Sequence, residues 1–367
     1  MDLEAFRQLF PVCKKSCYLN NAAESPMNLA VKQALDDYTS IVINEPYNKK
    51  SPRIAVRQGC AALLGGDSAD WALVNSTGHG IGMMARGYPW QKGDNVVLPA
   101  LEHWNNTFPW LALQAQGVDV RLVSPGSDER VDPSRINAAI DSRTRIVATA
   151  AVRFNTGFRA DLKRLSDIAH AKGALFLVDA IQAAGVCPIN VINDGIDILS
   201  AAAFKWLLGL PGSGALYVNA KARELIEPTM PGMFAAEDSY SELRYFNDAR
   251  RYETGTIAYP LFHAWTAGLD LLEEIGIPNI HSRVLELTGH LIDGLRSRDI
   301  AITSPVDDPA ERSAIVTMSL GDETANVALV EHLASKGIIV AIRDGRVRIS
   351  PNFYNTEEEI DRLVAAL

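Results

Sequence analysis

Short runs of apolar residues alternate with amphipathic segments through the first two thirds of the chain. The apolar runs predict buried strands at 71–76, 95–100, 118–124, 145–152, 174–180, 197–202 and 214–219. Segments with helical periodicity separate several of these runs, at 51–66, 77–87, 105–117 and 160–173. Steady alternation of strand and helix is typical of a mostly parallel sheet with helices on both faces. We therefore expect an α/β fold.

The pattern changes near residue 259. Two long amphipathic helices are predicted at 259–276 and 278–298, followed by strands at 313–320, 337–343 and 346–351. The last helix is expected to begin at Thr356, whose spacing from Glu359 fits a capping box. This part is expected to form a small α+β domain together with the first residues of the chain. The predicted division is a large domain at 20–258 and a small domain made of 1–19 plus 259–367.

Local signals place the ends of individual helices. The helix within 51–66 is expected to have Ser51 as its N-cap and Pro52 at its first position, and to stop at Gly65. Gly173 is expected to end the helix within 160–173. These positions can be compared directly with the structure.

Composition and charge narrow the class of protein. The 367 residues are 47% apolar and carry a formal net charge of −9, which favours a large globular core and disfavours a nucleic-acid or membrane-surface partner. The N-terminus lacks the basic and apolar segments of a secretory signal, and no apolar run is long enough to span a bilayer. The spacing of Cys13 and Cys17 is a poor zinc pattern. We expect a cytoplasmic protein with reduced cysteines and no metal site.

Asp179 and Lys205 are charged residues in apolar surroundings. Asp179 ends a predicted strand, and reactive groups of open α/β sheets lie at the carboxyl ends of strands. An ionised carboxylate there needs a positive partner. Lys205 lies between Phe204 and Trp206, where burial would depress its pKa and favour a nucleophilic amine. The alternative is a surface cation whose stem packs on the two aromatic rings.

The segment NSTGHGIG connects a predicted strand to a helix through a tight glycine turn. The backbone N–H groups at the start of such a helix form an anion site, as a phosphate would require. A dinucleotide-binding turn is the competing interpretation, with Asp94 as its acidic residue. The glycines at 78, 80 and 82 do not have the spacing of that fingerprint.

Several segments in this order and spacing resemble the class V aminotransferase family of pyridoxal-phosphate enzymes. That family includes cysteine desulfurases, kynureninases and isopenicillin epimerases. The segments are YLNNAA, STGHGIG, LEHWNNTFPW, NTGFRADL, VDAIQAAG, FKWLLGLPGSGALYV, RYETGT and RVRISPNFYNTEEEIDRL. The resemblance covers nearly the whole chain. It implies fold type I of the pyridoxal-phosphate-dependent transferases, with pyridoxal 5'-phosphate (PLP) as the cofactor.

The resemblance also implies roles for residues around the PLP ring. Asp179 pairs with the pyridinium nitrogen, which lets the ring accept electrons. Lys205 is the catalytic residue: it forms the Schiff base with the cofactor and then moves a proton. His103 stacks on the ring, and Gln182 hydrogen-bonds its phenolic oxygen. The implied cofactor-binding residues are Thr77, Gly78, His79, His103, Asp179, Gln182, Lys205 and Thr256.

Further implied roles concern the phosphate and the substrate. Thr77 and the amides of Gly78 and His79 form the phosphate-binding turn. Thr256 reaches the phosphate of a neighbouring subunit, so the resemblance implies a homodimer with shared active sites. The implied substrate-binding residues are Arg348, which grips the carboxylate of an amino acid, and Asn21.

Several of these residues have purely structural alternatives. His103 could be a residue at a helix start, Gln182 a solvated side chain in the first turn of a helix, and Thr256 a turn hydroxyl. Arg348 could be a cation on a strand surface. These interpretations stay open on the residues alone.

The chain departs from the family pattern at three places. Ala202 and Phe204 stand where the family usually has Ser and His, and Arg153 and Phe154 stand where many members have a Ser-Asn pair. Arg153 could face either the cofactor or the substrate. Residues 337–350 lack the cysteine that persulfide-forming desulfurases carry shortly before the substrate arginine. Desulfuration through an enzyme persulfide is therefore disfavoured.

Three reactions on an α-amino acid remain, and all of them use Asp179 and Lys205. An aminotransferase is the preferred prediction. A C–S β-lyase, acting on cysteine or a cysteine conjugate, and an amino-acid epimerase are the alternatives. A non-catalytic relative of the family is disfavoured because Lys205, Asp179 and Arg348 are all retained.

Overall fold

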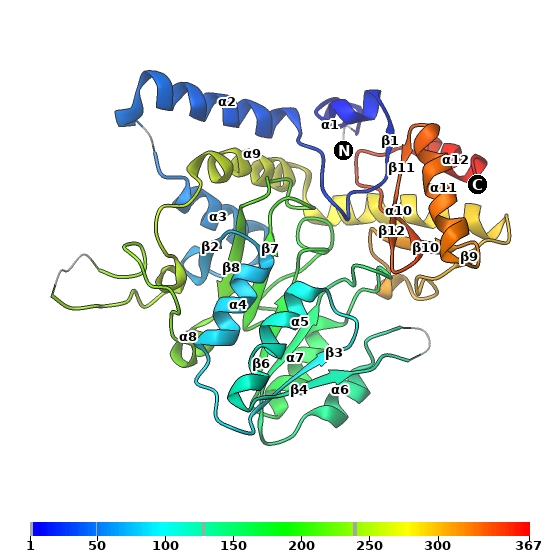
Figure 1. Cartoon of the computed structure of the whole chain (residues 1–367). Coiled ribbons are helices and arrows are strands. Elements are labelled where there is room, and N and C mark those ends of the chain that lie inside the picture. Colours follow the sequence, from blue (N-terminus) through cyan, green and yellow to red (C-terminus); the bar gives the residue numbers. More distant parts are fainter. Residues whose placement is uncertain (1–2, 49, 127–128, 238–240) are drawn as a thin grey trace.

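The computed structural model describes residues 3–48, 50–126, 129–237 and 241–367, and a seven-stranded sheet forms its centre (Figure 1). The strands are β2 (Trp71–Val74), β3 (Asn95–Pro99), β4 (Asp119–Val123), β5 (Thr144–Ala150), β6 (Leu175–Asp179), β7 (Ile198–Ala202) and β8 (Gly214–Val218). Their order across the sheet is β2-β8-β7-β6-β5-β3-β4. The predicted α/β fold with a mostly parallel sheet is confirmed.

Strand β8 is the exception, since it runs antiparallel to both β7 and β2. Only residues 203–213 separate β7 from β8, and this connection is too short for the helical crossover that a parallel neighbour needs. Because β2 and β7 are each antiparallel to β8, they run in the same direction. The carboxyl ends of β2, β3, β5, β6 and β7 therefore lie at one edge of the sheet.

Apolar side chains alternate between the two faces of the sheet. Leu177 belongs to one buried cluster and the next residue, Val178, belongs to another, as the period of a strand requires. Helix α4 (Thr77–Gly87) packs on the first face through Ile81, while α7 (Leu162–Ala171) and α9 (Tyr259–Ile275) cover the second through Leu165 and Trp265. Both faces are thereby buried.

The remaining large helices surround this sheet. They are α2 (Leu29–Asn44), α3 (Arg53–Leu64), α5 (Trp104–Leu111), α6 (Pro133–Ala139), α8 (Ala220–Leu225) and α10 (Ile277–Arg296). Helix α9 packs against α2 and α3. None of the helices in the described ranges has the length and apolar character needed to cross a membrane.

A smaller sheet lies at the end of the molecule where both chain termini are found (Figure 1). Strands β9 (Ala301–Ile302), β10 (Val316–Ser319), β12 (Ala341–Arg343) and β13 (Arg346–Ile349) pair antiparallel in the order β12-β13-β10-β9. Helices α11 (Glu323–Ser335) and α12 (Glu357–Ala365) belong to the same part of the molecule as these strands. The predicted capping box is confirmed, because Thr356 and Glu359 bond each other's backbone N–H groups.

The N-terminal segment contacts this smaller part. Arg7, in α1 (Leu3–Gln8), forms an ion pair of 2.8 Å with Glu359. Strand β1 (Cys17–Tyr18) pairs parallel with β11 (Ile338–Ile339). The division into domains at 20–258 and at 1–19 plus 259–367 stays a prediction.

Helix ends differ from the sequence-based expectations by small shifts. Helix α3 begins at Arg53 with Pro52 as its N-cap, although Ser51 was the expected cap; Gly65 follows its last residue as predicted. The helix expected at 105–117 is α5, which ends at Leu111, followed by a short 3-10 turn. Pro109 lies inside α5 and removes one backbone donor, which weakens the preceding turn of this short helix.

Candidate active site

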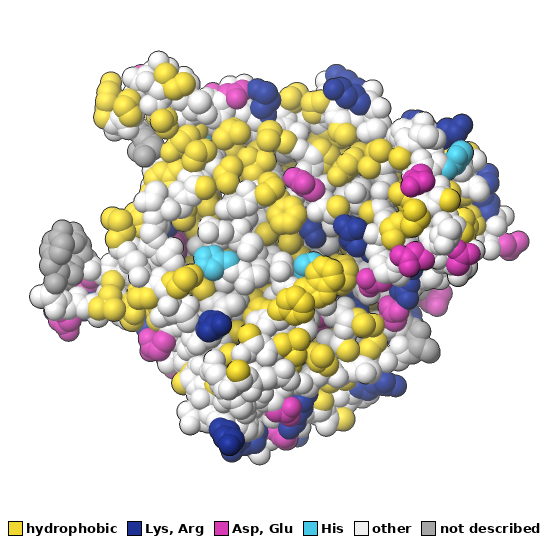
Figure 2. Space-filling view, in the orientation of Figure 1, with side chains coloured by type: hydrophobic (Ala, Val, Ile, Leu, Met, Phe, Trp, Pro, Cys, Tyr) yellow, Lys and Arg dark blue, Asp and Glu magenta, His cyan; other side chains and the backbone are white. Residues whose placement is uncertain are grey.

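Five of the residues singled out in the sequence line one cavity at the carboxyl edge of the large sheet, which we call the inner cavity. They are Thr77, His103, Asp179, Gln182 and Lys205. An adjoining cavity of about 590 Å³, the outer cavity, shares His103, Gln182 and Lys205 with the first and extends to the smaller sheet. Figure 2 shows hydrophobic, histidine and basic side chains close together near the middle of this face.

Asp179 is the last residue of β6 and is 3% exposed. Its Oδ1 accepts a hydrogen bond of 3.0 Å from the backbone N–H of Ile181. Burial raises the pKa of this carboxyl to about 7, and the nearby charge of Glu102 acts in the same direction. Within the described ranges no cation forms an ion pair with it. The site therefore holds a buried acid that lacks a positive partner.

Lys205 follows β7 and lines both cavities. Its Nζ lies 5.6 Å from the ring centroid of Phe204. Burial lowers the pKa of the amine to about 7, and the charges of Arg348 and Arg343 also lower it, while Asp179 opposes them. A large fraction of the amine is consequently uncharged at neutral pH and able to act as a nucleophile.

The first turn of α4 lies beside the end of β7. The Ser76 side chain caps this helix by accepting from the His79 N–H, and the Thr77 hydroxyl accepts from the Ala202 N–H at 2.9 Å. Gly80 is required here, because a Cβ would lie 2.3 Å from the Ser200 hydroxyl oxygen. The close packing fixes the helix start, with its backbone N–H groups, at the cavity edge.

The structure argues against the dinucleotide-binding interpretation, because Asp94 does not lie near the glycine turn. Asp94 immediately precedes β3, at the amino end of that strand. Its carboxylate pairs with Arg145 at 2.8 Å. This position is at the opposite edge of the sheet from the glycine turn.

His103 is the N-cap of α5 and separates the two cavities. Its Nδ1 accepts from the Asn105 N–H at 3.2 Å, and its ring meets Phe154 edge to face with centroids 5.2 Å apart. Burial lowers the pKa of the imidazole, and the charge of Lys205 lowers it further, so His103 is neutral at physiological pH. A neutral ring beside Phe154 gives the cavity a largely apolar wall.

The amide of Gln182 is held by the protein. Its Nε2 donates to the Ala22 carbonyl, and its Oε1 accepts from the Trp206 indole N–H, each at 3.0 Å. One N–H of this amide thus stays available toward the inner cavity. The fixed position excludes a solvated first-turn residue.

Asn21, Thr256 and the pair Gly78 and His79 do not line either cavity. Asn21 is fully buried; its Nδ2 donates to the Ser350 carbonyl and its Oδ1 accepts from the Tyr354 hydroxyl. Thr256 is exposed on the loop before α9. Gly78 and His79 belong to the first turn of α4, behind Thr77.

Arg348 lies in β13 and lines the outer cavity with a side chain that is almost wholly buried. One guanidinium nitrogen donates to the Phe154 carbonyl at 3.0 Å, whereas Nε and Nη2 have no hydrogen-bond partner among the described residues. Burial lowers the pKa of this group to about 9, and the charge of Arg343 contributes. A buried guanidinium with two free donors is a site for a carboxylate.

Two arginines were not assigned from the sequence. Arg343 lines the outer cavity from the β12–β13 hairpin, where register places it opposite Arg346. Arg153 lines neither cavity; its Nη2 donates to the carbonyl groups of Ala100 and Leu101. The crowding of arginines in IRDGRVR was the available signal for Arg343, whereas nothing local indicated the position of Arg153.

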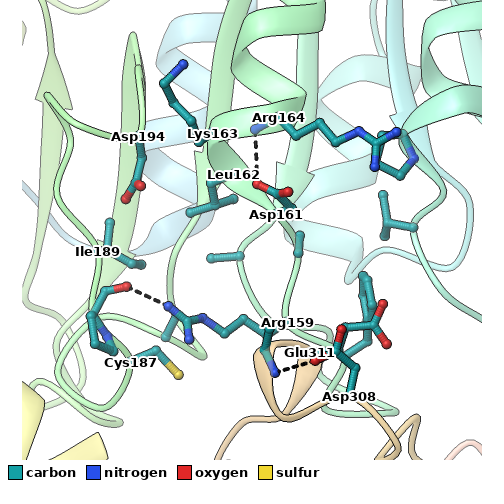
Figure 3. A pocket seen from close by; sticks show the side chains of 18 residues that line it. Arg159, Asp161, Leu162, Lys163, Arg164, Cys187, Ile189, Asp194, Asp308 and Glu311 are labelled. Atoms are coloured by element: carbon teal, nitrogen blue, oxygen red, sulfur yellow. Dashed lines mark hydrogen bonds between the residues drawn. The ribbon is translucent and has the colours of Figure 1, made fainter.

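A third cavity, of about 440 Å³, lies elsewhere and contains none of the predicted site residues (Figure 3). Arg159 crosses it, with Nη2 donating to the Pro188 carbonyl and its backbone N–H to the Glu311 carbonyl. Acidic and basic side chains are mixed along its walls, including Asp161 and Lys163. The inner and outer cavities therefore form the candidate site.

The residues present fit PLP. The buried carboxylate of Asp179 lacks the cation that a pyridinium nitrogen would supply, and Lys205 offers an amine of lowered pKa in the same cavity. Thr77 and the start of α4 provide donors for a phosphate at the edge of that cavity. This set would hold the two charged ends of the cofactor, and Lys205 would hold its aldehyde carbon.

Comparisons with known proteins agree with this geometry. The family model for Aminotransferase class-V matches residues 17–363. A probable cysteine desulfurase of Methanothermobacter thermautotrophicus is 30% identical, with 99% of this chain and 96% of the relative covered. A cysteine desulfurase of Klebsiella pneumoniae is also 30% identical, with 85% of this chain and 81% of the relative covered.

Solved structures share the fold. The cysteine desulfurase of Thermococcus onnurineus superposes with a TM-score of 0.90 at 23% identity, covering 99% of this chain and 96% of that one. A C-DES variant with glycine covalently linked to its PLP cofactor gives 0.90 at 20% identity, covering 98% of both chains. The chain therefore belongs to the class V aminotransferase family and is a PLP-dependent enzyme of fold type I.

Proposed function

We propose that this enzyme acts on an α-amino acid and that transamination is its reaction. The observation that carries the α-amino acid substrate is Arg348, whose two unpartnered nitrogens are buried in the cavity that Lys205 also lines. Transamination is preferred among the possible reactions because the chain belongs to the class V aminotransferase family. A guanidinium with two donors matches the carboxylate of an amino acid. Binding there would bring the rest of the amino acid toward the amine of Lys205.

When bound, PLP supplies an electron sink that stabilises negative charge on the substrate Cα. Asp179 would hold the proton on the ring nitrogen by acting as its counter-ion. Lys205 Nζ would take the proton from Cα and deliver it to the carbon that was the aldehyde carbon of the cofactor, a task suited to an amine whose pKa is about 7. His103 and Phe154 would exclude water from this side of the cavity.

Cleavage of a C–S bond is the second candidate. The names of the relatives from M. thermautotrophicus and K. pneumoniae favour it, because both are called cysteine desulfurases. No cysteine lines the inner or outer cavity, and residues 337–350 contain none. A β-elimination needs no thiol from the protein, so it fits this chain better than sulfur transfer through an enzyme persulfide does.

One experiment separates the reactions. The PLP-loaded enzyme is mixed with a panel of amino acids without any 2-oxo acid. Conversion of the cofactor to its amino form supports transamination; pyruvate and ammonia with unchanged cofactor support β-elimination. Exchange of the Cα hydrogen with solvent alone indicates epimerisation. The proposed function is wrong if no amino acid produces any of these changes and the wild-type enzyme behaves in the same way as a Lys205→Ala control.

We also propose that two copies of the chain share their active sites through Thr256. Its exposure and its position outside both cavities support a role toward a second subunit. Mixed dimers of a Lys205→Ala chain and a Thr256→Ala chain test this. Shared sites predict that mixed dimers have one site lacking both groups and one site intact, so some activity returns on mixing. Sedimentation as a monomer would exclude sharing.

A further inference from the structure

Arg343 is a cation without a carboxylate partner. Within the described ranges it forms no ion pair, and its Nη1 donates to the carbonyl of Ile342 at 2.6 Å. Its hairpin neighbour Arg346 is fully engaged, with Glu129 at 2.5 Å. The two arginines differ in what they face: Arg343 lines the outer cavity, and Arg346 does not.

The outer cavity carries both basic and acidic side chains. Arg343, Arg348 and Lys205 line it, and the charges of the two arginines act on each other and on the lysine. Two acids also line it, but both are held by other groups. Glu102 accepts from the Ala150 N–H at 3.1 Å, and Asp344 accepts from the Asn155 amide at 2.9 Å.

Arg343 and Arg348 offer two separate positions for anionic groups in this cavity. When the cofactor is bound to Lys205, Arg343 and Arg348 remain as the cations of the outer cavity. The α-carboxylate of an amino acid would take the free donors of Arg348, which lie deepest. Arg343 is partly exposed and stays without a counter-ion. A second anionic group on the same molecule would relieve the repulsion between the two guanidinium groups.

We propose that the substrate is an amino acid whose side chain carries a second acidic group, and that Arg343 is its counter-ion in the outer cavity. The inference rests on the proposed function, because Arg348 is assigned there to the α-carboxylate. It adds the substrate class: a dianionic amino acid with a carboxylate or a comparable sulfur acid at its far end. Arg343 is then a specificity-determining residue, since it touches only the variable part of the substrate.

Binding of simple acids tests this without turnover. The PLP-loaded enzyme is titrated by calorimetry with succinate and glutarate, and with propionate and butyrate as matched monocarboxylates. We expect the tighter-binding dicarboxylate to bind at least about tenfold more tightly than its matched monocarboxylate. This is the effect of one additional charge-assisted hydrogen bond. Arg343→Gln should remove this advantage. Arg346→Gln, which alters the same hairpin but not the cavity, should retain it.

Two results would overturn the inference. Equal affinity for dicarboxylates and monocarboxylates excludes a second anion site. An equal loss of affinity for both in Arg343→Gln would show that Arg343 holds the common carboxylate instead. The proposed function can fail independently of this inference. If dicarboxylates bind more tightly than monocarboxylates but no amino acid reacts, only the proposed function is contradicted. Equal kcat/KM for L-aspartate and L-asparagine, in an enzyme that reacts with both, contradicts only this inference.

Discussion

Replacing Asp179 with asparagine should stabilise the protein when the cofactor is absent and weaken it when the cofactor is bound. The carboxyl group is 3% exposed, and its pKa is raised to about 7 chiefly by burial. Asparagine has nearly the same shape, carries no charge, and can still accept the hydrogen bond from the Ile181 N–H. The substitution therefore isolates the effect of charge.

The size of the effect follows from the pKa shift. The ordinary value is 3.8 and the folded value is about 7, so the folded protein binds this proton more tightly than the unfolded chain does. Stability of the wild type consequently falls as pH rises from about 4 to about 7, by at most roughly 4 kcal/mol at about 1.4 kcal/mol per pKa unit. The gain in Asp179→Asn should be about 1–2 kcal/mol at pH 5 and should approach roughly 4 kcal/mol at pH 8.

Urea unfolding of cofactor-free protein, followed by tryptophan fluorescence at pH 5 and pH 8, measures this gain. Asp197→Asn is the matched control. Asp197 is also buried, but its carboxylate accepts from the Phe176 N–H and the Asn219 amide, each at 2.7 Å. The same carboxylate also contacts His170 Nε2 at 2.7 Å. Asparagine keeps only one oxygen for these donors, so the substitution should destabilise the control by about 1–3 kcal/mol at both pH values.

Bound PLP should reverse the effect of Asp179→Asn on stability. Its pyridinium nitrogen would supply the missing cation, and removing one member of a buried ion pair costs about 3–5 kcal/mol. The variant should thus bind PLP at least roughly 100-fold more weakly than the wild type. If Asp179→Asn destabilises the cofactor-free protein at pH 8 as Asp197→Asn does, the carboxylate is not an uncompensated charge and the argument is refuted.

Lys205, Arg348 and Glu253 give three further predictions. The rate of PLP attachment, followed by absorbance, should rise with pH and level off above about 7, where the Lys205 amine is uncharged; a flat profile contradicts this. Arg348→Lys should raise KM for the amino acid by about tenfold or more with a smaller effect on kcat, because lysine lacks the two-donor fork. Glu253→Gln should lower the free energy of unfolding by about 3–5 kcal/mol in denaturant titrations, since Arg53 and Arg57 lose their buried partner; a loss below about 1 kcal/mol contradicts this.

The large sheet could be predicted because six of its strands are almost wholly buried and read as apolar runs, whereas β4 at the sheet edge is partly exposed although a buried strand was predicted there. Strand direction could not be predicted in the same way, because an antiparallel strand such as β8 has the same apolar pattern as a parallel one. Only the short connection at 203–213 distinguishes them. The shift at α3 places Pro52 at the N-cap and not at the first helical position, and the predicted helix at 105–117 is divided into α5 and a 3-10 turn.

Within the candidate site, residues at strand ends were predictable and residues fixed by distant contacts were not. Asp179 is the last residue of β6, and Lys205 follows the neighbouring strand β7. Both therefore lie at the same edge of the sheet and line one cavity. Asn21 is turned away from the cavities by Tyr354, a partner 333 positions along the chain. Arg343 and Arg346 look alike in the sequence, and only the pairing of Arg346 with Glu129 separates them.

The negative overall charge of the chain does not exclude an anionic substrate in the outer cavity, because a bound ligand interacts mainly with the charges close to it. The net charge of −9 is spread over the whole surface, where salt at physiological strength screens interactions beyond about 8 Å. Arg343 and Arg348 line one cavity, and burial of Arg348 removes much of the solvent that would weaken its field. In the proposed complex, Arg348 and Arg343 would each pair with one anionic group of the substrate, while Glu102 and Asp344 accept hydrogen bonds from the Ala150 N–H and the Asn155 amide. The net charge of −9 is therefore compatible with a small dianionic substrate in the outer cavity.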